Sequence, residues 1–207
     1  CKAGSLAGGY GTYEYPVVIK TEEQFVKFSG GYWNDSYVSL AADLDFADKY
    51  FDSVSGQFSG VFYGNGHTIA NAEIGGCTYS ELGLFKELSG GIVQDLILKN
   101  PNIQIAGNSG LCYVGGIAGK ASSSKIQRCE IIDGIVSASP NSGYACVGGI
   151  VGELRGSQLE GCITRNLGVH VGESGSGSSV SGDLGGIAGY VTSNSKIKYC
   201  GKEDGLI

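Results

Sequence analysis

A glycine-rich pentapeptide that returns at nearly regular intervals constrains the fold of this chain more than any other feature. Gly-Gly-Ile-Ala-Gly at 115–119 recurs as Gly-Gly-Ile-Val-Gly at 148–152 and as Gly-Gly-Ile-Ala-Gly at 185–189, and a degenerate copy, Leu-Gly-Leu-Phe, lies at 82–85. Counted from the glycine of the degenerate copy, the steps between equivalent glycines are 33, 33 and 37 residues. Such a period is typical of an architecture in which each structural unit stacks on the next.

Composition favours short strands and tight turns over helices. Glycine supplies 37 of the 207 residues and proline only three, and charged residues make up 16% of the chain. Each repeat divides into a glycine-flanked strand (115–119), a serine-rich turn (121–124) and two more strands (125–131 and 134–138). Three short strands per unit, with no helical pattern between them, predict an all-β fold in which each unit is one coil of a parallel β-helix.

The repeat also predicts which side chains enter the core of each coil. In one coil and the next we expect inward-pointing side chains that stack on one another, namely Ile117, Ile126 and Ile135, and Ile150, Leu159 and Val169. The last interval is four residues longer than the others, and the excess lies in the serine- and glycine-rich segment 172–179. That composition predicts a flexible loop.

A different sequence precedes the repeats. Residues 1–12 are glycine-rich and are expected to form a flexible arm or a leading strand. Residues 13–207 are expected to form one domain, with leader and cap coils at 13–81 and repeats at 82–207. Within the leader, Thr21-Glu-Glu-Gln24 has the form of a capping box and predicts a short helix at 22–28. Because a stack of strands needs its open end covered, this helix is expected to cap the coils.

Seven cysteines follow the repeat rather than the close Cys-x-x-Cys spacing of zinc sites. The first group, which lies 14, 14 and 15 residues after the first glycine of its repeat, is Cys129, Cys162 and Cys200. The second group, which precedes the glycine pair by three and two residues, is Cys112 and Cys146. Cys1 and Cys77 lie outside the repeats. Cysteines in register on successive coils predict cross-coil disulfides in an oxidising compartment, with Cys112–Cys146 as first choice. The alternative is a set of buried thiols that stack as small apolar side chains.

Charge and hydropathy exclude several classes of partner. The net charge is −6 and the 14 basic residues are scattered, which argues against nucleic acid because phosphate binding needs clustered Lys and Arg. No apolar run approaches the roughly 20 residues that span a bilayer. A chain that begins at Cys1 and contains no Met resembles a processed bacterial lipoprotein with a lipidated N-terminus; the alternative is a fragment boundary.

The repeats resemble those of bacterial surface proteins that carry GLUG-type repeats. The matching pieces are the three glycine-rich pentapeptides, followed by Lys-Ile-Gln-Arg-Cys at 125–129, Gln-Leu-Glu-Gly-Cys at 158–162 and Lys-Ile-Lys-Tyr-Cys at 196–200. The leader is also similar, in Tyr-Pro-Val-Val-Ile-Lys-Thr at 15–21, Ala-Asp-Leu-Asp-Phe at 42–46 and the segment 58–69. The resemblance covers nearly the whole chain after residue 12.

This resemblance implies a right-handed parallel β-helix of the pectate-lyase-like kind on proteins exported to the cell surface, often described as adhesins. The family shares no catalytic residues, so the likeness implies location and architecture rather than chemistry. The chain departs from it by its many cysteines and few repeats, which leaves open whether it is a monomeric module or a building block.

One acidic cluster is a candidate for chemistry. It comprises Asp43, Asp45, Asp48 and Asp52, with Lys49 and His67 nearby in the sequence. Two of these aspartates could serve as acid and base on a glycan or as calcium ligands. The alternative, that they bond turn amides, is favoured because later coils contain no matching column of acids. His67 is similarly expected to stabilise a turn, and His170 has no acidic residue immediately beside it.

The aromatic residues near the N-terminus are the other candidate. Tyr32 and Trp33 could stack on sugars, although packing in the core or cap explains them equally well. We therefore expect a non-enzymatic structural or adhesive module, secreted or on the cell surface, without cofactor or bound metal. Its expected partners are a second copy that assembles end to end, another surface protein or a glycan. The alternative is a polysaccharide lyase or glycoside hydrolase on the same scaffold.

Overall fold

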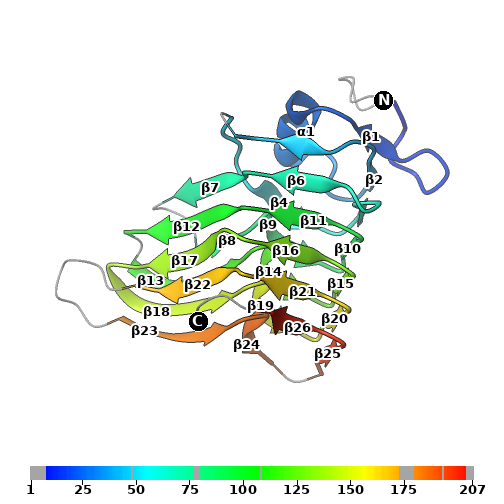
Figure 1. Cartoon of the computed structure of the whole chain (residues 1–207). Coiled ribbons are helices and arrows are strands. Elements are labelled where there is room, and N and C mark those ends of the chain that lie inside the picture. The colour runs from blue at the N-terminus through cyan, green and yellow to red at the C-terminus, as the bar shows by residue number, and fades with distance from the viewer. Residues whose placement is uncertain are drawn as a thin grey trace.

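The chain forms a parallel β-helix in which each coil of strands lies on the one before it, from the blue N-terminal end to the red C-terminal end of Figure 1. The structure is a computed structural model that describes residues 8–47, 49–76, 80–107, 109–172, 180–192 and 194–203. Within these ranges the paired strands are parallel and belong to successive coils. The predicted all-β, parallel β-helix architecture is confirmed.

Five parallel sheets, which we number I to V, run along the described coils. Sheet I has seven strands: β1 (Val17–Ile19), β2 (Tyr37–Leu40), β5 (Val61–Tyr63), β10 (Ile92–Gln94), β15 (Lys125–Gln127), β20 (Gln158–Glu160) and β25 (Lys196–Lys198). Sheet II has six: β3 (Leu44–Asp45), β6 (Thr68–Ala70), β11 (Ile97–Lys99), β16 (Glu130–Ile132), β21 (Ile163–Arg165) and β26 (Gly201–Glu203).

The other three sheets complete each coil. Sheet III contains β7 (Glu73–Gly76), β12 (Asn102–Ala106), β17 (Ile135–Ser139) and β22 (Gly168–Val171). Sheet IV contains β8 (Glu81–Leu82), β13 (Ser109–Gly115), β18 (Ser142–Gly148) and β23 (Val180–Gly185). Sheet V contains β4 (Val54–Phe58), β9 (Phe85–Ser89), β14 (Ala118–Ser122), β19 (Val151–Arg155) and β24 (Ala188–Val191).

A complete coil therefore contains one strand from each of five sheets, not the three strands predicted. The glycine-rich pentapeptide is not a strand of its own, because Gly116 and Ile117 form the corner between β13 and β14. Two further corners, at Arg128 and Asp133, have left-handed backbone with φ of 49° and 59°. Corners built on residues other than glycine carry little signal in a single sequence. The sequence therefore predicts one strand where a corner separates two, or places the bounds of a strand wrongly.

One column of corners is held by a ladder of amide side chains. Asn71, Asn100, Asp133 and Asn166 have φ between 47° and 59°, a region that Asn and Asp enter more readily than other residues with a side chain. Asn71 Nδ2 donates to Asp45 Oδ1 at 2.8 Å, Asn100 Nδ2 to Asn71 Oδ1 at 2.8 Å, and Asn166 Nδ2 to Asp133 Oδ1 at 2.9 Å. The ladder keeps successive coils in register on the side between sheets II and III.

The core lies inside the coils, where apolar side chains stack in register. Five of the six predicted core residues are buried, namely Ile117, Ile126, Ile150, Leu159 and Val169. The prediction for Ile135 is wrong, because its side chain is 41% exposed. Gly134 adopts a left-handed φ of 82°, which shifts the inward-pointing positions of β17 by one residue. Val136 therefore enters the core in place of Ile135, and it pairs with Val169.

The predicted capping helix is present as α1 (Glu22–Ser29), which lies across the blue end of the coils in Figure 1. Thr21 Oγ1 accepts from Gln24 N at 3.4 Å, and Gln24 Oε1 accepts from Thr21 N at 3.2 Å, which completes the capping box. Phe25 and Phe28 are fully buried beneath the helix. No helix among the described residues is long and apolar enough to cross a membrane.

The described end of the N-terminal arm joins the leader coil through its backbone. Val18 N donates to Gly8 O at 3.2 Å, and Tyr37 N donates to Gly11 O at 2.9 Å. A tight turn at 64–66 has left-handed backbone, with φ of 55° at Asn65 and 76° at Gly66. Residues 1–7 of the arm and residues 173–179 of the predicted loop lie outside the described residues.

Candidate functional site: a groove at the glycine corner

The glycine corner turns the outer faces of sheets IV and V toward one another. A Cβ atom on Gly152 would lie 2.5 Å from Val114 N, and one on Gly189 would lie 2.7 Å from Val147 N. Only glycine lets the strands of sheet V come this close to the backbone of sheet IV. Outward side chains of the two sheets therefore converge along a groove, which we call the corner groove.

Two columns of outward side chains line the corner groove. In sheet IV the strand register stacks Glu81, Tyr113, Cys146 and Asp183. In sheet V it stacks Glu87, Lys120, Glu153 and Tyr190. Contacts between the columns show that they face one another, since Lys120 Nζ lies 2.6 Å from Glu81 Oε1 and 4.4 Å from the ring centroid of Tyr113.

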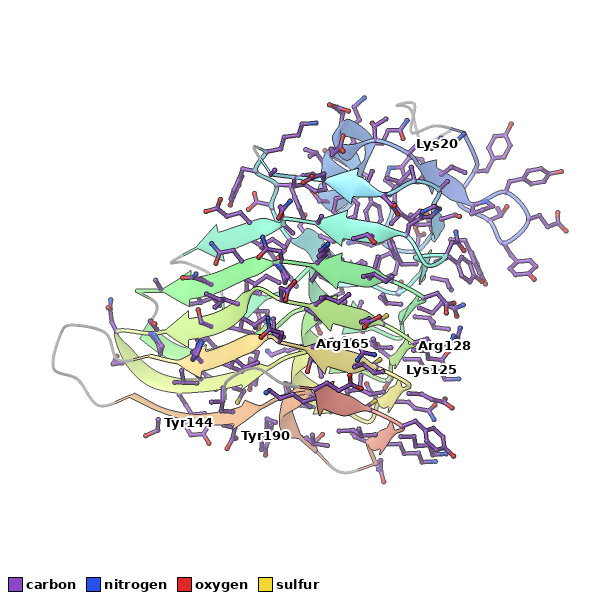
Figure 2. The ribbon with its side chains drawn as sticks, in the orientation of Figure 1. Lys20, Lys125, Arg128, Tyr144, Arg165 and Tyr190 are labelled. Carbon is purple, nitrogen blue, oxygen red and sulfur yellow. The ribbon has the colours of Figure 1, made fainter. Side chains whose placement is uncertain are left out.

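A hollow of about 440 Å³ opens in the groove. Its lining is Leu111, Tyr113, Tyr144, Cys146, Asp183 and Tyr190. Figure 2 shows Tyr144 and Tyr190 beside β23, near the lower edge of the coils. Cys146 is 2% exposed although it lies on the outer face, so the surrounding side chains cover it. The size and the mixture of aromatic rings with a few polar groups are those of a small-molecule site.

The hollow has a negative electrostatic environment. Tyr144 has its pKa raised, chiefly because its hydroxyl is hydrogen-bonded to Asp183. Burial raises the pKa of Cys146 to about 12, with the charges of Asp183 and Glu153 adding to the effect. Burial, followed by the charge of Glu153, also raises the pKa of Tyr113. In each case the form with one more negative charge is disfavoured where Asp183 or Glu153 is near.

Two carboxylates of the corner groove, Glu81 and Glu153, are already paired with cations, but Asp183 is not. Arg155 Nη2 lies 2.8 Å from Glu153 Oε1, and Lys120 pairs with Glu81. No arginine or lysine in the described part of the chain lies within ion-pair distance of Asp183. The half-buried Asp183 therefore leaves a net negative charge beside the tyrosine rings.

The first two members of the predicted acidic cluster bond backbone amides, Asp43 at the start of β6 and Asp45 in its own turn. Asp43 Oδ1 accepts from Thr68 N at 2.9 Å and contacts His67 Nδ1 at 3.0 Å, and the bond from Thr68 N, followed by that of His67, lowers its pKa. Asp45 Oδ1 accepts from Ala47 N at 3.0 Å as well as from the amide ladder.

The rest of the cluster does not assemble a metal site. Asp52 accepts a hydrogen bond of 3.1 Å from Tyr50, and Lys49 pairs with Glu22 at 3.2 Å. Asp48 lies outside the described residues. Over the described ranges, no group of three or more His, Cys, Asp or Glu side chains is arranged to hold a metal ion.

The two predicted glycan-contact residues differ in exposure. Trp33 is only 9% exposed and belongs to the core cluster, so the prediction of a sugar-stacking indole is wrong. Tyr32 is 80% exposed, and its contact with a glycan stays a prediction. His170 lies on β22 with an exposed side chain.

The predicted disulfide between Cys112 and Cys146 is opposed by the strand register. Cys112 pairs with Ala145 and Cys146 with Tyr113, a difference of one residue, so the first thiol points into the core and the second into the corner groove. The column of Cys129, Cys162 and Cys200 is confirmed, and Cys162 N donates to Cys200 Sγ at 3.4 Å.

All five described cysteines are free thiols, which matches the alternative of stacked apolar side chains. Cys1 and Cys77 lie outside the described residues. Burial raises the pKa of Cys112 to about 11, and the pKa of Cys162 is raised to about 12, with its hydrogen bond to Cys129 the largest cause.

These thiols are expected to resist alkylation while the protein is folded. Because the thiolate is the reactive form, burial together with a raised pKa should slow labelling of Cys112 and Cys162 by iodoacetamide roughly ten-fold or more relative to the unfolded chain. Mass mapping of the protein, labelled with and without urea in the absence of reductant, measures this. A disulfide-linked peptide pair drawn from the five described cysteines would contradict it.

The sequence carried a weak signal for the corner groove. Tyr113 and Tyr144 precede their glycine pairs by two and four residues, and Tyr190 follows its pair at the end of the pentapeptide. Each tyrosine is therefore close to a repeat, but the three do not occupy one repeat position. Only the fold, which joins two sheets at the corner, brings them to one hollow.

Comparisons with known proteins support the architecture alone. No family model matches the chain, and no curated protein is significantly similar to it in sequence. Among solved structures, the crystal structure of a protein from Bacteroides ovatus, named as a candidate immunoglobulin A1 protease, is similar, with a TM-score of 0.56 and 22% identity. The match covers 94% of this chain and 77% of that one. At this identity the likeness extends to the fold and not to the activity.

Proposed function

We propose that this chain is a non-catalytic β-helix module that serves a structural or adhesive role on an exported surface protein. The observation that carries the proposal is the engagement of carboxylates in holding the coils together. Asp43 bonds the amide of Thr68 in the next coil, and Asp95 and Glu130 pair with arginines of the next coil. Asp45 and Glu153 are engaged locally, by Ala47 N and by Arg155. Groups held in this way stabilise a scaffold rather than exchange protons with a substrate.

The direction of the pKa shifts supports the same proposal. The pKa of Asp43 is lowered by Thr68 N and that of Asp95 by its hydrogen bond from Arg128. A general acid in a glycoside hydrolase needs the opposite shift, so that it stays protonated near neutral pH. Raised pKa values at the buried thiols likewise disfavour the cysteine thiolate that a cysteine protease would use.

The resemblance to GLUG-type surface proteins supports the location and the adhesive role. A long scaffold of stacked coils presents many outward side chains to a large partner. The partners included in the proposal are a glycan, another surface protein and a second copy of the chain. One enzymatic alternative is a polysaccharide lyase or hydrolase. A second alternative, suggested by the name of the structural neighbour, is a protease.

A single panel experiment separates binding from turnover. The protein is incubated with acidic and neutral glycans and with immunoglobulin A1, and both retention on immobilised ligand and cleavage products are measured. We expect retention of at least one ligand without any product, and the same result for Asp43→Asn and Asp45→Asn. Cleavage that either substitution abolishes would overturn the proposal in favour of an enzyme.

A further inference from the structure

The corner groove contains a site that goes beyond a general adhesive role. We propose that its hollow binds an organic cation of the quaternary ammonium type, with the rings of Tyr144 and Tyr190 against the alkyl groups and Asp183 supplying the opposing charge. The inference rests on the groove alone and holds whichever surface the module is attached to.

The side chains that line the hollow suit a cation. Three of its six lining residues are tyrosines, one is an aliphatic residue and one is the carboxylate of Asp183. Tyr144 and Tyr190 are 39% and 45% exposed, so their rings are accessible from solvent. Aromatic rings attract cations through the negative potential of the ring face, and quaternary ammonium groups are recognised in this way.

The groove already holds one cation of the chain itself. Lys120 Nζ lies 4.4 Å from the ring centroid of Tyr113, at one end of the hollow, while Glu81 balances its charge at 2.6 Å. Tyr190 and Asp183 offer the same arrangement, a tyrosine ring and a carboxylate on either side of a cation, to an external ligand two coils further along the groove.

The charge of the hollow also favours a cationic ligand. Asp183 is the carboxylate of the hollow without a cationic partner among the described residues. The pKa of Tyr144 is raised chiefly by its hydrogen bond to Asp183, and that of Cys146 is raised chiefly by burial, with the charge of Asp183 the next cause. An anionic ligand would be repelled there, and a neutral sugar would gain nothing from the charge, whereas a cation gains from both the charge and the rings.

Tyr144 brings one ring of the hollow next to the carboxylate, since the hydrogen bond between its hydroxyl and Asp183 is the main cause of its raised pKa. Trimethylammonium groups carry charge without N–H donors and pack their methyl groups on ring faces. The same group occurs in free choline and in choline lipid headgroups, and these two sources are separated by the test.

The test is a titration of the full chain followed by NMR shifts of the tyrosine ring signals. The probes are choline, vesicles of phosphatidylcholine, and 3,3-dimethyl-1-butanol, in which carbon replaces the charged nitrogen. We expect saturable shifts with choline and affinity for the neutral isostere at least ten-fold weaker, which corresponds to about 1.4 kcal/mol. Shifts with the vesicles as well would assign a lipid headgroup, and shifts with choline alone would assign a free ligand.

Variants tie the binding to the hollow. Asp183→Asn and Tyr190→Leu should each weaken choline binding about ten-fold. Tyr199→Leu is the matched control, because Tyr199 is 86% exposed, belongs to the same coil and does not line the hollow. All three positions are on the surface, so circular dichroism should show an unchanged fold. Equal binding of the isostere, no saturable shift with choline, or equal loss in Tyr199→Leu would overturn the proposal.

Discussion

Replacing Gly149 with alanine is expected to lower the free energy of unfolding by about 3 kcal/mol. A Cβ atom on this residue would lie 2.1 Å from Gly186 O in the next coil and 2.9 Å from Thr164 Cγ2. The nearer atom belongs to the backbone, so the clash cannot be relieved by turning a side chain. The two coils would have to separate at the glycine corner.

The separation would spread because the corner also carries hydrogen bonds between coils. Gly149 N donates to Gly185 O at 3.0 Å, and Gly116 N donates to Gly149 O at 3.0 Å. Moving the coils apart at this point weakens both bonds and loosens the packing of the neighbouring Ile150, which is fully buried. The expected loss therefore exceeds that of a single strained contact.

Urea unfolding followed by circular dichroism measures the effect. The control is Gly201→Ala, since Gly201 lies on β26 with nothing within 4 Å of its added Cβ and without a left-handed φ. Its unfolding midpoint should stay close to that of the unchanged protein. If Gly149→Ala and Gly201→Ala unfold at the same urea concentration, close approach of the coils is not what requires glycine in the pentapeptide.

The glycine corner also shows how far the sequence could predict the fold. A period of 33 residues predicts stacking because one coil must bury its face against the next, and Ile117, Ile126 and Val169 are in the core as that argument requires. The capping box at Thr21 is a local pattern, because its two hydrogen bonds join residues three apart, and it could therefore also be predicted from the sequence.

The wrong predictions about side-chain direction have one physical cause, which is that each coil has more corners than the sequence indicates. Successive side chains of a strand point to opposite faces of the sheet. One unrecognised corner therefore assigns the side chains that follow it to the wrong face. The corner at Gly134 exposed Ile135, and the offset between Cys112 and Cys146 separated their thiols across sheet IV. Left-handed corners at ordinary residues such as Arg128 give a single sequence no warning.

The candidate site was less predictable than the fold. Asp43 and Asp45 are close in sequence, yet Asp45 bonds Ala47 N of its own turn and Asp43 bonds Thr68 N of the next coil. Tyr144, Asp183 and Tyr190 come from three different strands, and only the concave angle between sheets IV and V brings them to one hollow. Sites of this kind depend on the relative orientation of sheets, which no local pattern encodes.

The second large effect is expected at the opposite end of the molecule. Phe28→Ala should lower the free energy of unfolding by about 4 kcal/mol, because a fully buried aromatic side chain would be replaced by a cavity. The ring centroid of Phe28 lies 5.7 Å from that of Phe62, 6.0 Å from that of Phe58 and 6.3 Å from that of Phe85. These partners lie on β5, β4 and β9, so one side chain joins the helix to two sheets.

The matched control is Val26→Ala, on the exposed side of the same helix. Val26 is 42% exposed, so its truncation should change the free energy of unfolding by no more than about 0.5 kcal/mol. Both variants are compared by urea unfolding, together with the binding of a hydrophobic dye. Equal midpoints for the two variants would contradict a capping role for α1.

Dye binding distinguishes a cap from an ordinary packed helix. If α1 covers the end of the coils, its loosening in Phe28→Ala should uncover Phe46, Phe51 and Phe62 before the lower coils unfold, so dye binding should rise at urea concentrations below the main transition. A helix that is merely one more part of a cooperative core would unfold together with the strands and give a single transition. The order of these two signals therefore tests whether the capping box at Thr21 begins a structure that protects the end of the stack.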